Sequence, residues 1–241
     1  MAKHIPRIYC PDLEMGPIIL PDDCHLHLVS VLKLKPGDEI IVFNVESGEW
    51  LCILDSIRKH SIIARKWRLL REYQPGRQRL GLAFCPIKPG NTGLIIEKCT
   101  ELGATDFWPI ISEFTNYKFK FDKMKMIAKG ATEQCGRLDI PVIHQEISFE
   151  NFVNELPPDF LWISALERLE ERQNSSIDTS KNCGFIVGPE GGFSESERNR
   201  LLDLTIPITL SPNVLRSETA AISCIAIAAS KSLGFPEFTE N

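Results

Sequence analysis

A glycine-rich segment in the last quarter of the chain has the residue types that close contact with a ligand requires. Residues 187–193 read VGPEGGF, and the following SESE is a Ser-x-x-Glu pattern, which is typical of a helix N-terminus. The three glycines permit positive φ angles and let the backbone approach a ligand closely. Such a loop offers backbone N–H and C=O groups and the Glu190 carboxylate. Taken alone, it is equally well explained as a tight turn without a ligand.

A second segment places an arginine at the start of a helix. Residues 210–220 read LSPNVLRSETA, in which a proline and an asparagine predict a turn, and a helix is expected to begin near Ser217. Glu218 falls in its first turn, where the helix dipole favours negative charge. Residues 220–229 are nearly all small and apolar, which predicts a buried, closely packed helix. Burial does not explain Arg216 at the entrance of that helix.

The patterns of several other chemistries are missing. The glycine loop is neither GxxxxGK[ST] nor GxGxxG, so it lacks the residues of phosphate-binding and dinucleotide-binding loops. The eight cysteines form no CxxC pair, which excludes a zinc knuckle or CxxC redox site and indicates reduced, mostly buried thiols. No pair of the five histidines has metal-ligand spacing with a supporting acid, so no metal is expected.

The charge distribution is more informative than the net charge of −5. Residues 58–79 carry eight basic side chains against one acidic side chain, Glu72, and residues 118–129 carry five lysines. Either cluster can bind phosphates locally, although a solvated surface explains each one equally well. No apolar run approaches the roughly 20 residues of a membrane span, and the first ten residues lack a signal-peptide pattern. A cytoplasmic protein is therefore expected.

The elements that must position these segments differ between the two parts of the chain. Before residue 74, short strands and turns predict a small β-barrel, with one short helix over Asp22–Leu32 in which Leu28, Val31 and Leu32 share a face. The strands are expected at 40–44, 49–54 and 62–64, with a linker at 74–77. After it, strands at 80–85, 107–111, 160–164, 184–187 and 206–210 alternate with helices at 92–102, 122–135, 194–204 and 217–233. This alternation predicts a mostly parallel sheet with helices on both faces, and residues 167–182 form a polar surface loop.

The two segments GPEGGFSESE and LSPNVLRSETAAI resemble the signature segments of the ribosomal RNA small subunit methyltransferase E family, which belongs to the SPOUT methyltransferases. Further similarity lies, in the same order, at residues 6–9, 27–38, 96–103 and 133–137, so the resemblance covers essentially the whole chain. It implies an α/β fold with an RNA-binding PUA-like β-barrel at residues 1–74. It also implies a SPOUT domain at residues 79–241 with a deep trefoil knot, a rare exception among folds.

The resemblance also implies an activity, S-adenosylmethionine-dependent methylation of N3 of a specific uridine in 16S rRNA. The enzymes of the family act as homodimers, with the final helix in the interface, on 16S rRNA or the assembled small ribosomal subunit. The residues implied to bind S-adenosylmethionine are Ser164, Leu166, Val187, Gly188, Pro189, Glu190, Gly191, Gly192, Leu210, Ser211, Asn213, Val214, Leu215, Thr219 and Ala220.

Two residues are expected to serve catalysis, Arg216 and Glu218. Uracil N3 carries a weakly acidic proton, so the enzyme must hold an unpaired or flipped base and remove that proton. Arg216 is expected to stabilise negative charge on the uracil oxygens, and Glu218 or Glu190 to orient the base or accept the proton. The alternative is that Arg216 only pairs with Glu218 or Glu190 and fixes the loop.

The residues expected to contact RNA are Arg7, Lys33, Lys35, Lys88 and Arg137. Three places depart from the family pattern. Lys33 replaces an arginine and so keeps the charge but loses the bidentate fork. Phe114 and the pair Leu138-Asp139 stand where relatives often carry positive charge, and the lysines of residues 118–129 are expected to compensate.

Three other functions stay open. The chain fits a SPOUT methyltransferase that acts on another RNA site or base atom, or a catalytically silent RNA-binding protein. The intact segments at 188–192 and 215–219 argue against the silent protein. A nucleotide-dependent α/β enzyme is disfavoured by the missing phosphate-loop residues.

Overall fold

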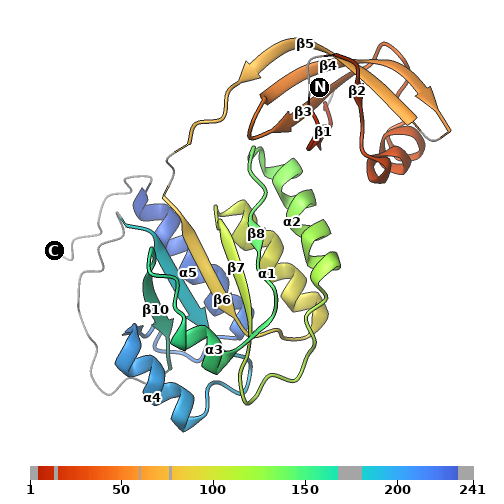
Figure 1. The fold of residues 1–241 in the computed structure, drawn as a ribbon. Coiled ribbons are helices and arrows are strands. Elements are labelled where there is room, and N and C mark those ends of the chain that lie inside the picture. The colour runs from red at the N-terminus through yellow and green to blue at the C-terminus, as the bar shows by residue number, and fades with distance from the viewer. Residues whose placement is uncertain (1–4, 14–15, 60, 76–77, 168–180, 233–241) are drawn as a thin grey trace. The chain divides into compact units, whose positions relative to one another are not determined.

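The computed structural model describes residues 5–13, 16–59, 61–75, 78–167 and 181–232, and the chain divides into two compact units (Figure 1). Unit 1 comprises Met1–Gly76 and Thr132–Ile140, and unit 2 comprises Arg77–Ala131 and Pro141–Asn241. The sequence placed a division near residue 74 but gave no indication that residues 132–140 belong with the first part. The assignment of an RNA-binding domain to 1–74 and a methyltransferase domain to 79–241 stays a prediction.

Unit 1 is built on a five-stranded sheet with the order β1-β3-β4-β5-β2. Its strands are β1 (Arg7–Tyr9), β2 (Ile18–Ile19), β3 (Glu39–Asn44), β4 (Gly48–Arg58) and β5 (Ser61–Arg71). Strand β1 runs parallel to β3, and the other pairs are antiparallel. The long β4–β5 pair shifts its register at three places, and bulges of this kind increase twist and bend a strand. The sheet therefore curls, as a small barrel-like domain requires.

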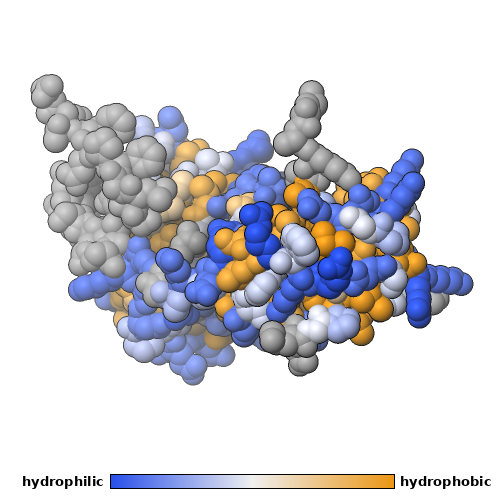
Figure 2. All heavy atoms as spheres, turned by 90° about the horizontal axis from the view of Figure 1, so that it is seen from above, coloured by the Kyte–Doolittle hydropathy of each residue, from blue (hydrophilic) through white to orange (hydrophobic). Residues whose placement is uncertain are grey.

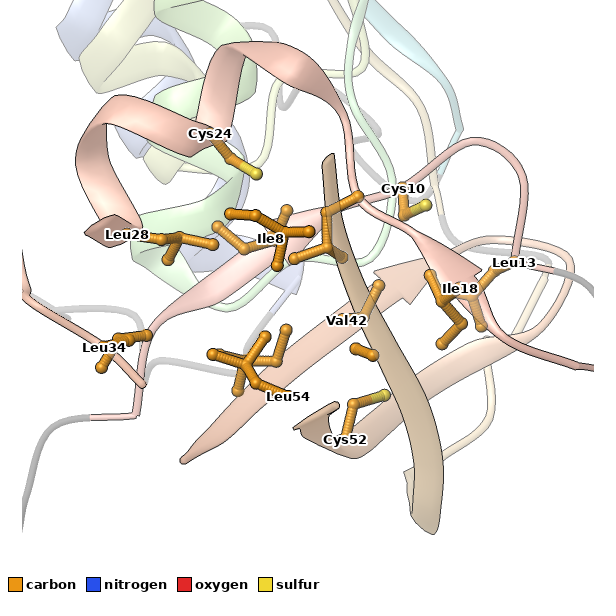
Figure 3. Packing of buried hydrophobic residues seen from close by; sticks show 14 residues of the cluster. Ile8, Cys10, Leu13, Ile18, Cys24, Leu28, Leu34, Val42, Cys52 and Leu54 are labelled. Carbon is orange, nitrogen blue, oxygen red and sulfur yellow. The ribbon is translucent and has the colours of Figure 1, made fainter. Parts of the chain in front are cut away.

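The concave side of this sheet encloses the core of unit 1 (Figure 3). Side chains from different strands meet there, among them Ile8, Val42 and Leu54, and Leu28 closes the cluster from a helical segment. Buried cysteine thiols belong to the same cluster. All eight cysteines of the chain are free, and all but Cys135 are buried, in agreement with the expectation of reduced thiols.

The helical segment that closes this core differs from the expected α-helix over Asp22–Leu32. A 3₁₀ turn at Asp22–Cys24 is followed by a π-helix, Leu26–Val31, whose end is marked by the bond from Leu32 N–H to His27 O. The wider π turn changes which side chains share a face. Leu28 is fully buried, whereas Val31 and Leu32 are exposed, so the three residues do not form one buried face.

Unit 2 contains a parallel sheet with the strand order β12-β10-β11-β6-β7-β8, and β9 pairs with β7. The strands are β6 (Leu80–Phe84), β7 (Asp106–Ile111), β8 (Val142–Ile143), β9 (Ile147–Ser148), β10 (Leu161–Ala165), β11 (Cys183–Val187) and β12 (Ile206–Ile208). Every residue of β6 and β11 is buried, as expected for central parallel strands that are covered on both faces.

Helices cover both faces of this sheet (Figure 1). They are α1 (Pro89–Glu101), α2 (Phe121–Cys135), α3 (Phe149–Asn154), α4 (Glu195–Leu204) and α5 (Ser217–Ser232). Helix α5 contacts α1, β6 and β11, whereas α3 contacts α4 and β7 on the other face. The alternating pattern was thus predicted correctly, but α3 and the two-residue strands β8 and β9 were missed. The loop predicted at 167–182 lies mostly outside the described residues, and no described helix is long and apolar enough to span a membrane.

Helix α5 is less buried than its composition predicted. One stripe of the helix is buried, formed by Ala221, Cys224, Ile225 and Ala228. Several other apolar residues are only partly buried, and Ile227 is exposed. An apolar helix with an uncovered side is typical of a surface that a partner covers.

Candidate cofactor and active site

A cavity of about 740 Å³ opens at the carboxyl ends of β10, β11 and β12. Ligands of parallel α/β sheets bind at this edge, and the volume lies in the usual range for a small-molecule site. The residues that line it follow the three strands and the start of α5: Ala165, Leu166, Glu167, Val187, Gly188, Pro189, Glu190, Gly191, Gly192, Phe193, Arg198, Thr209, Leu210, Ser211, Pro212, Asn213, Val214, Leu215, Arg216, Ser217 and Ala220. The structure thus brings together the two segments that the sequence singled out.

The glycine loop follows β11 and turns sharply before α4. Gly192 has a φ of +72°, which side chains rarely tolerate, and its N–H donates to the carbonyl oxygen of Pro189 at 2.9 Å. A Cβ atom on Gly191 would lie 3.1 Å from the Cβ of Phe114, closer than is usual for such contacts. The glycines therefore serve both backbone conformation and close packing, and they keep the backbone available at the cavity wall.

The Glu197 carboxylate holds this loop to a second loop of unit 2. Its oxygens accept hydrogen bonds from the backbone N–H groups of Ser194 at 3.0 Å and Glu113 at 2.9 Å. The first bond belongs to the capping box that the sequence predicted at the start of α4. The second was not predicted, because nothing in the sequence pairs residue 197 with residue 113. Glu197 is only 9% exposed, so the carboxylate depends on these donors for its hydrogen bonds.

The start of α5 is attached to the same glycine loop. The Ser217 hydroxyl donates to the carbonyl oxygen of Gly188 at 2.6 Å. The turn before the helix is fixed by Thr209, whose hydroxyl donates to the Leu166 carbonyl at 3.1 Å, and by the Asn213 N–H, which donates to the Ser211 hydroxyl at 3.1 Å. The cavity walls are thus connected by side-chain bonds rather than by strand pairing alone.

The charged side chains at the cavity are Glu167, Glu190, Arg198 and Arg216. The Arg198 guanidinium donates to the backbone carbonyl of Glu167 at 2.9 Å. Arg216 is exposed, and within the described ranges no carboxylate forms an ion pair with it. The alternative that Arg216 pairs with a nearby glutamate therefore has no support from this geometry.

Three of the residues assigned to the site from the sequence are not part of the cavity lining. Ser164 is fully buried, and its hydroxyl accepts a hydrogen bond from Thr205 at 2.8 Å. Glu218 accepts a hydrogen bond from the Asn91 amide at 3.1 Å, whereas Thr219 is exposed. The cofactor roles of Ser164 and Thr219 and the catalytic role of Glu218 stay predictions. Of the lining residues, Arg198 and Thr209 carried no signal in the sequence.

Cys85 directly follows β6 at this edge of the sheet, and its N–H donates to the carbonyl of Val187 at 3.1 Å. Burial raises the pKa of Cys85 to about 11, although its contacts with the Ser112 and Thr115 hydroxyls favour the thiolate. At neutral pH the group is a protonated thiol, and it is therefore a poor nucleophile. Among the described residues, no three His, Cys, Asp or Glu side chains gather as metal ligands.

A second charged network lies at the opposite, amino edge of the unit 2 sheet. The buried Asp106 carboxylate accepts hydrogen bonds from Arg79 at 2.7 Å, His144 at 3.2 Å and Thr105 at 2.7 Å. Burial alone would raise the pKa of Asp106, but these hydrogen bonds and the charge of Arg79 outweigh it, so the pKa is lowered. The pKa of Arg79 is raised by the same hydrogen bond. This network ties the strand ends together, and none of its members lines the cavity.

The predicted RNA contacts are of two kinds in the structure. Lys33, Lys35 and Lys88 are exposed, and Lys33 has a φ of +53°, a left-handed conformation that is uncommon for lysine. Arg7 and Arg137 are largely buried and already bound. Arg7 pairs with Glu49 at 2.7 Å and also donates to backbone carbonyls within unit 1, and Arg137 pairs with Asp139 at 2.6 Å. Their contact with RNA stays a prediction.

The positions that depart from the family pattern have structural partners here. Leu138 is buried, and Asp139 neutralises Arg137, so this pair belongs to the packing of unit 1. Phe114 packs against the glycine loop at Gly191 in unit 2. The lysines at 118, 120, 123 and 125 are exposed, as a phosphate-binding surface requires.

Two known domain families match this chain. A family described as an RNA methyltransferase domain matches residues 74–229, and one described as an RNA methyltransferase PUA domain matches residues 26–66. A ribosomal RNA small subunit methyltransferase E of Rickettsia conorii is 34% identical over 88% of this chain and 89% of its own length. The chain belongs to the ribosomal RNA small subunit methyltransferase E family. A member from Bacillus subtilis is 27% identical over 94% of this chain and 95% of its own length.

Solved structures of this family have the same fold. The small subunit methyltransferase E of Neisseria gonorrhoeae, described as bound to S-adenosyl methionine, superposes with a TM-score of 0.81 at 26% identity and covers 98% of this chain and 100% of its own. A Legionella pneumophila protein, described as a methyltransferase in complex with the cofactor SAM, superposes with a TM-score of 0.86 at 26% identity, over 95% and 98% of the two chains. The curled sheet of unit 1 is thus PUA-like, and unit 2 has the SPOUT fold. The deep trefoil knot stays a prediction.

The cavity fits a nucleoside with an amino-acid tail. Backbone groups of the glycine loop and of residues 210–215 face it together with apolar side chains such as Leu166 and Val187. Backbone donors and acceptors recognise the edges of a purine, and apolar walls accept its faces. Added side chains at Gly188 or Gly191 would crowd Phe193 or Phe114 at 3.0 and 3.1 Å. The chain therefore has both the volume and the open backbone that S-adenosylmethionine requires.

Proposed function

We propose that this protein transfers the methyl group of S-adenosylmethionine to N3 of a specific uridine in 16S rRNA. The observation that carries the proposal is the cavity at the carboxyl edge of the sheet. The two family signature segments line this cavity together, and the exposed Arg216 is one of the lining residues. The cofactor, when bound, supplies an electrophilic methyl group. We further assign the lining residues among those predicted from the sequence to its binding.

The residues of the chain then have distinct tasks in the transfer. Arg216 lies at the cavity without an ion-pair partner among the described residues, so its guanidinium is available to the oxygens of a uracil. Negative charge spreads onto these oxygens when N3 loses its proton, and a fixed cation stabilises it. For the proton acceptor the geometry favours Glu190, which lines the cavity, over Glu218, which is bonded to Asn91.

The role of Arg216 is tested by two substitutions. Arg216→Ala is expected to lower kcat by about 100- to 1000-fold, the usual cost of losing one charge-stabilising donor. Arg216→Lys keeps the charge without the fork and is expected to lie between alanine and wild type. Affinity for S-adenosylmethionine, measured by calorimetry, serves as the control and is expected to change little. A kcat for Arg216→Ala within a few-fold of wild type would refute the catalytic role.

The RNA and the assembly are proposed on different grounds. We infer that the substrate is 16S rRNA within the small ribosomal subunit, in the cytoplasm, and that residues 118–129 add phosphate contacts.

We also infer a homodimer, because α5 carries the exposed Ile227 and its neighbour α1 the exposed Leu94. Light scattering after size exclusion tests this inference. A dimer that becomes monomeric with Ile227→Glu supports it, and a monomeric wild-type protein refutes it.

The proposed function is tested with labelled S-adenosylmethionine and small ribosomal subunits from cells that lack the enzyme. Recovery of the label as N3-methyluridine at one position confirms donor, substrate and product together. Label at another base atom or in another RNA identifies a different SPOUT activity. Binding of the donor without any transfer would reject this substrate but not the cofactor site. Nucleotide triphosphates are expected not to compete for the cavity.

A further inference from the structure

One tryptophan of unit 1 is exposed although its side chain is large and mostly apolar. Trp67, in the second half of β5, is 64% exposed. The other three are accommodated, because Trp50 and Trp162 donate their indole N–H to backbone carbonyls and Trp108 stacks on His144 at 4.4 Å. In the part of the chain that the structure describes, no hydrogen bond or ring contact involves the Trp67 side chain. Tryptophan usually satisfies its N–H when it is structural, so this residue is a candidate for binding.

The register of the sheet places Trp67 in a bulge. On β5, Arg68 pairs with Leu51 and Lys66 pairs with Cys52, which leaves Trp67 as the extra residue between two consecutive pairs. Bulges change the direction of a side chain, and they are specific features rather than defects. The outward position of Trp67 therefore follows from strand pairing and not from a chance rotamer at the surface.

Arginines share the surface around this bulge. Arg65, Arg68 and Arg71 pair with residues 53, 51 and 49 of β4, which alternate and therefore line one face of the sheet. Arg65 is bound to Asp55 at 2.9 Å and Arg71 to Glu49 at 2.6 Å. Arg68 is exposed, and no described carboxylate neutralises it. An aromatic ring and an uncompensated guanidinium thus stand next to each other in the chain.

We propose that Trp67 and Arg68 form a binding site for an unpaired nucleotide of RNA, in which the base stacks on the indole and the phosphate pairs with the guanidinium. The proposal deepens the proposed function and rests on it, because that function makes RNA the substrate. Single-stranded RNA is recognised by stacking on aromatic side chains, and arginine binds phosphate through its planar fork.

The surroundings favour RNA over a protein partner. Exposed hydrophobic side chains are scattered among hydrophilic ones over the surface seen in Figure 2, so exposure alone identifies no site. Residues 65–71 hold four basic side chains and no acidic one in a protein of net charge −5. Arg65 and Arg71 are paired with Asp55 and Glu49, so the charge of this segment that has no carboxylate partner among the described residues is that of Lys66 and Arg68. Such uncompensated positive charge is what a polyanion requires.

The site is tested by equilibrium binding of a fluorescein-labelled single-stranded oligouridylate and of a labelled RNA duplex of equal length. Trp67→Ala is expected to weaken binding of the single strand by about 5- to 150-fold, the usual range for loss of one stacked base, and to leave duplex binding within about two-fold. Trp67→Phe retains a ring and is expected to recover most of the affinity. Arg68→Gln is expected to weaken both probes and to lower the salt dependence of single-strand binding by about 0.7 in slope.

The matched control is Ile19→Ala, which removes an apolar side chain of the same unit that is 67% exposed but lies on β2. It is expected to bind both probes as wild type does. Single-strand affinity of Trp67→Ala within two-fold of wild type would overturn the proposal, as would an equal loss for the duplex or an equal loss in Ile19→Ala.

Methyl transfer to small subunits separates this proposal from the proposed function. Trp67→Ala is expected to raise KM for the RNA at least five-fold, with little change in kcat or in affinity for S-adenosylmethionine. If the wild-type protein transfers no methyl group, the proposed function fails, while the oligouridylate measurement still decides on Trp67. If transfer proceeds and Trp67→Ala has an unchanged KM, the nucleotide site fails alone.

Discussion

Replacing Glu197 by alanine removes a carboxylate that joins the end of the glycine loop to the loop at Glu113. The side chain accepts one hydrogen bond from the Ser194 N–H and one from the Glu113 N–H, at 3.0 and 2.9 Å. A hydrogen bond to a charged group contributes about 1.5–3 kcal/mol net. Because water can enter the space that alanine leaves, part of this is recovered, and we expect a loss of about 2–4 kcal/mol in the free energy of unfolding.

The loss is measured by urea unfolding, followed through the fluorescence of Trp108 and Trp162 in the unit 2 core. Glu197→Gln keeps the shape and one acceptor oxygen, so it is expected to lose about half as much. Glu195→Ala is the matched control, because Glu195 is an exposed acid in the first turn of the same helix, where a change of at most about 0.5 kcal/mol is expected.

The same variants test whether the Glu197 carboxylate also positions the glycine loop for binding of the cofactor. Release of the loop is expected to weaken S-adenosylmethionine binding by calorimetry in Glu197→Ala but not in Glu195→Ala. The reasoning is refuted if Glu197→Ala unfolds within 0.5 kcal/mol of wild type, because the loss of two hydrogen bonds to a charged group is expected to cost more than that. It is also refuted if the two alanine variants are equally destabilised.

Three further predictions concern unit 2 and the cysteines. Gly184→Ala places a Cβ 2.6 Å from the Trp162 ring, and the overpacking is expected to cost about 1–3 kcal/mol in urea unfolding; an unchanged midpoint contradicts it. Because the pKa of Asp106 is lowered in the fold, the carboxylate stabilises the protein above its unfolded pKa of about 3.9, and this stability is lost as the pH falls through the lower folded pKa. In Asp106→Asn the unfolding midpoint is therefore expected to fall less steeply than in wild type as the pH is lowered. An equally steep fall in both proteins argues against this. Iodoacetamide at pH 8 is expected to label the half-buried Cys135 before the buried Cys85, because burial raises the pKa of Cys85 to about 11. Mass spectrometry of the labelled native protein gives the order, and earlier labelling of Cys85 contradicts the prediction.

The parts of the fold that follow from local patterns could be predicted from the sequence. Alternation of apolar strands and capped helices predicted the parallel sheet of unit 2, and the capping box at Ser194 is present. The short helix α3 and the two-residue strands β8 and β9 were missed because so few residues give no periodic signal. The π-helix was missed because its hydrogen bonds depend on how Leu28 fits the core, which is tertiary information.

The sequence predicted the parts of the candidate site that the two signature segments form. It did not predict the contacts that other elements make with these segments. The glycine loop and residues 210–216 line the cavity together, as expected for one site. Arg198 and the bond from Glu113 to Glu197 arise from contacts across the chain, and spacing cannot reveal them. Arg7 shows the same limit, since its ion pair with Glu49 and its bonds to backbone carbonyls cannot be read from the sequence, and its contact with RNA stays a prediction.

Strand β6 leaves the ribosome long before β11, which lies beside it in the finished sheet. At about 5–20 residues per second, the roughly one hundred residues between them take about 5–20 seconds to synthesise. During that time β7 can cover one edge of β6, while the other edge and a fully apolar strand stay open to pairing with other chains. Unit 2 of the nascent protein is therefore expected to depend on chaperones that bind extended apolar segments until β11 has been made.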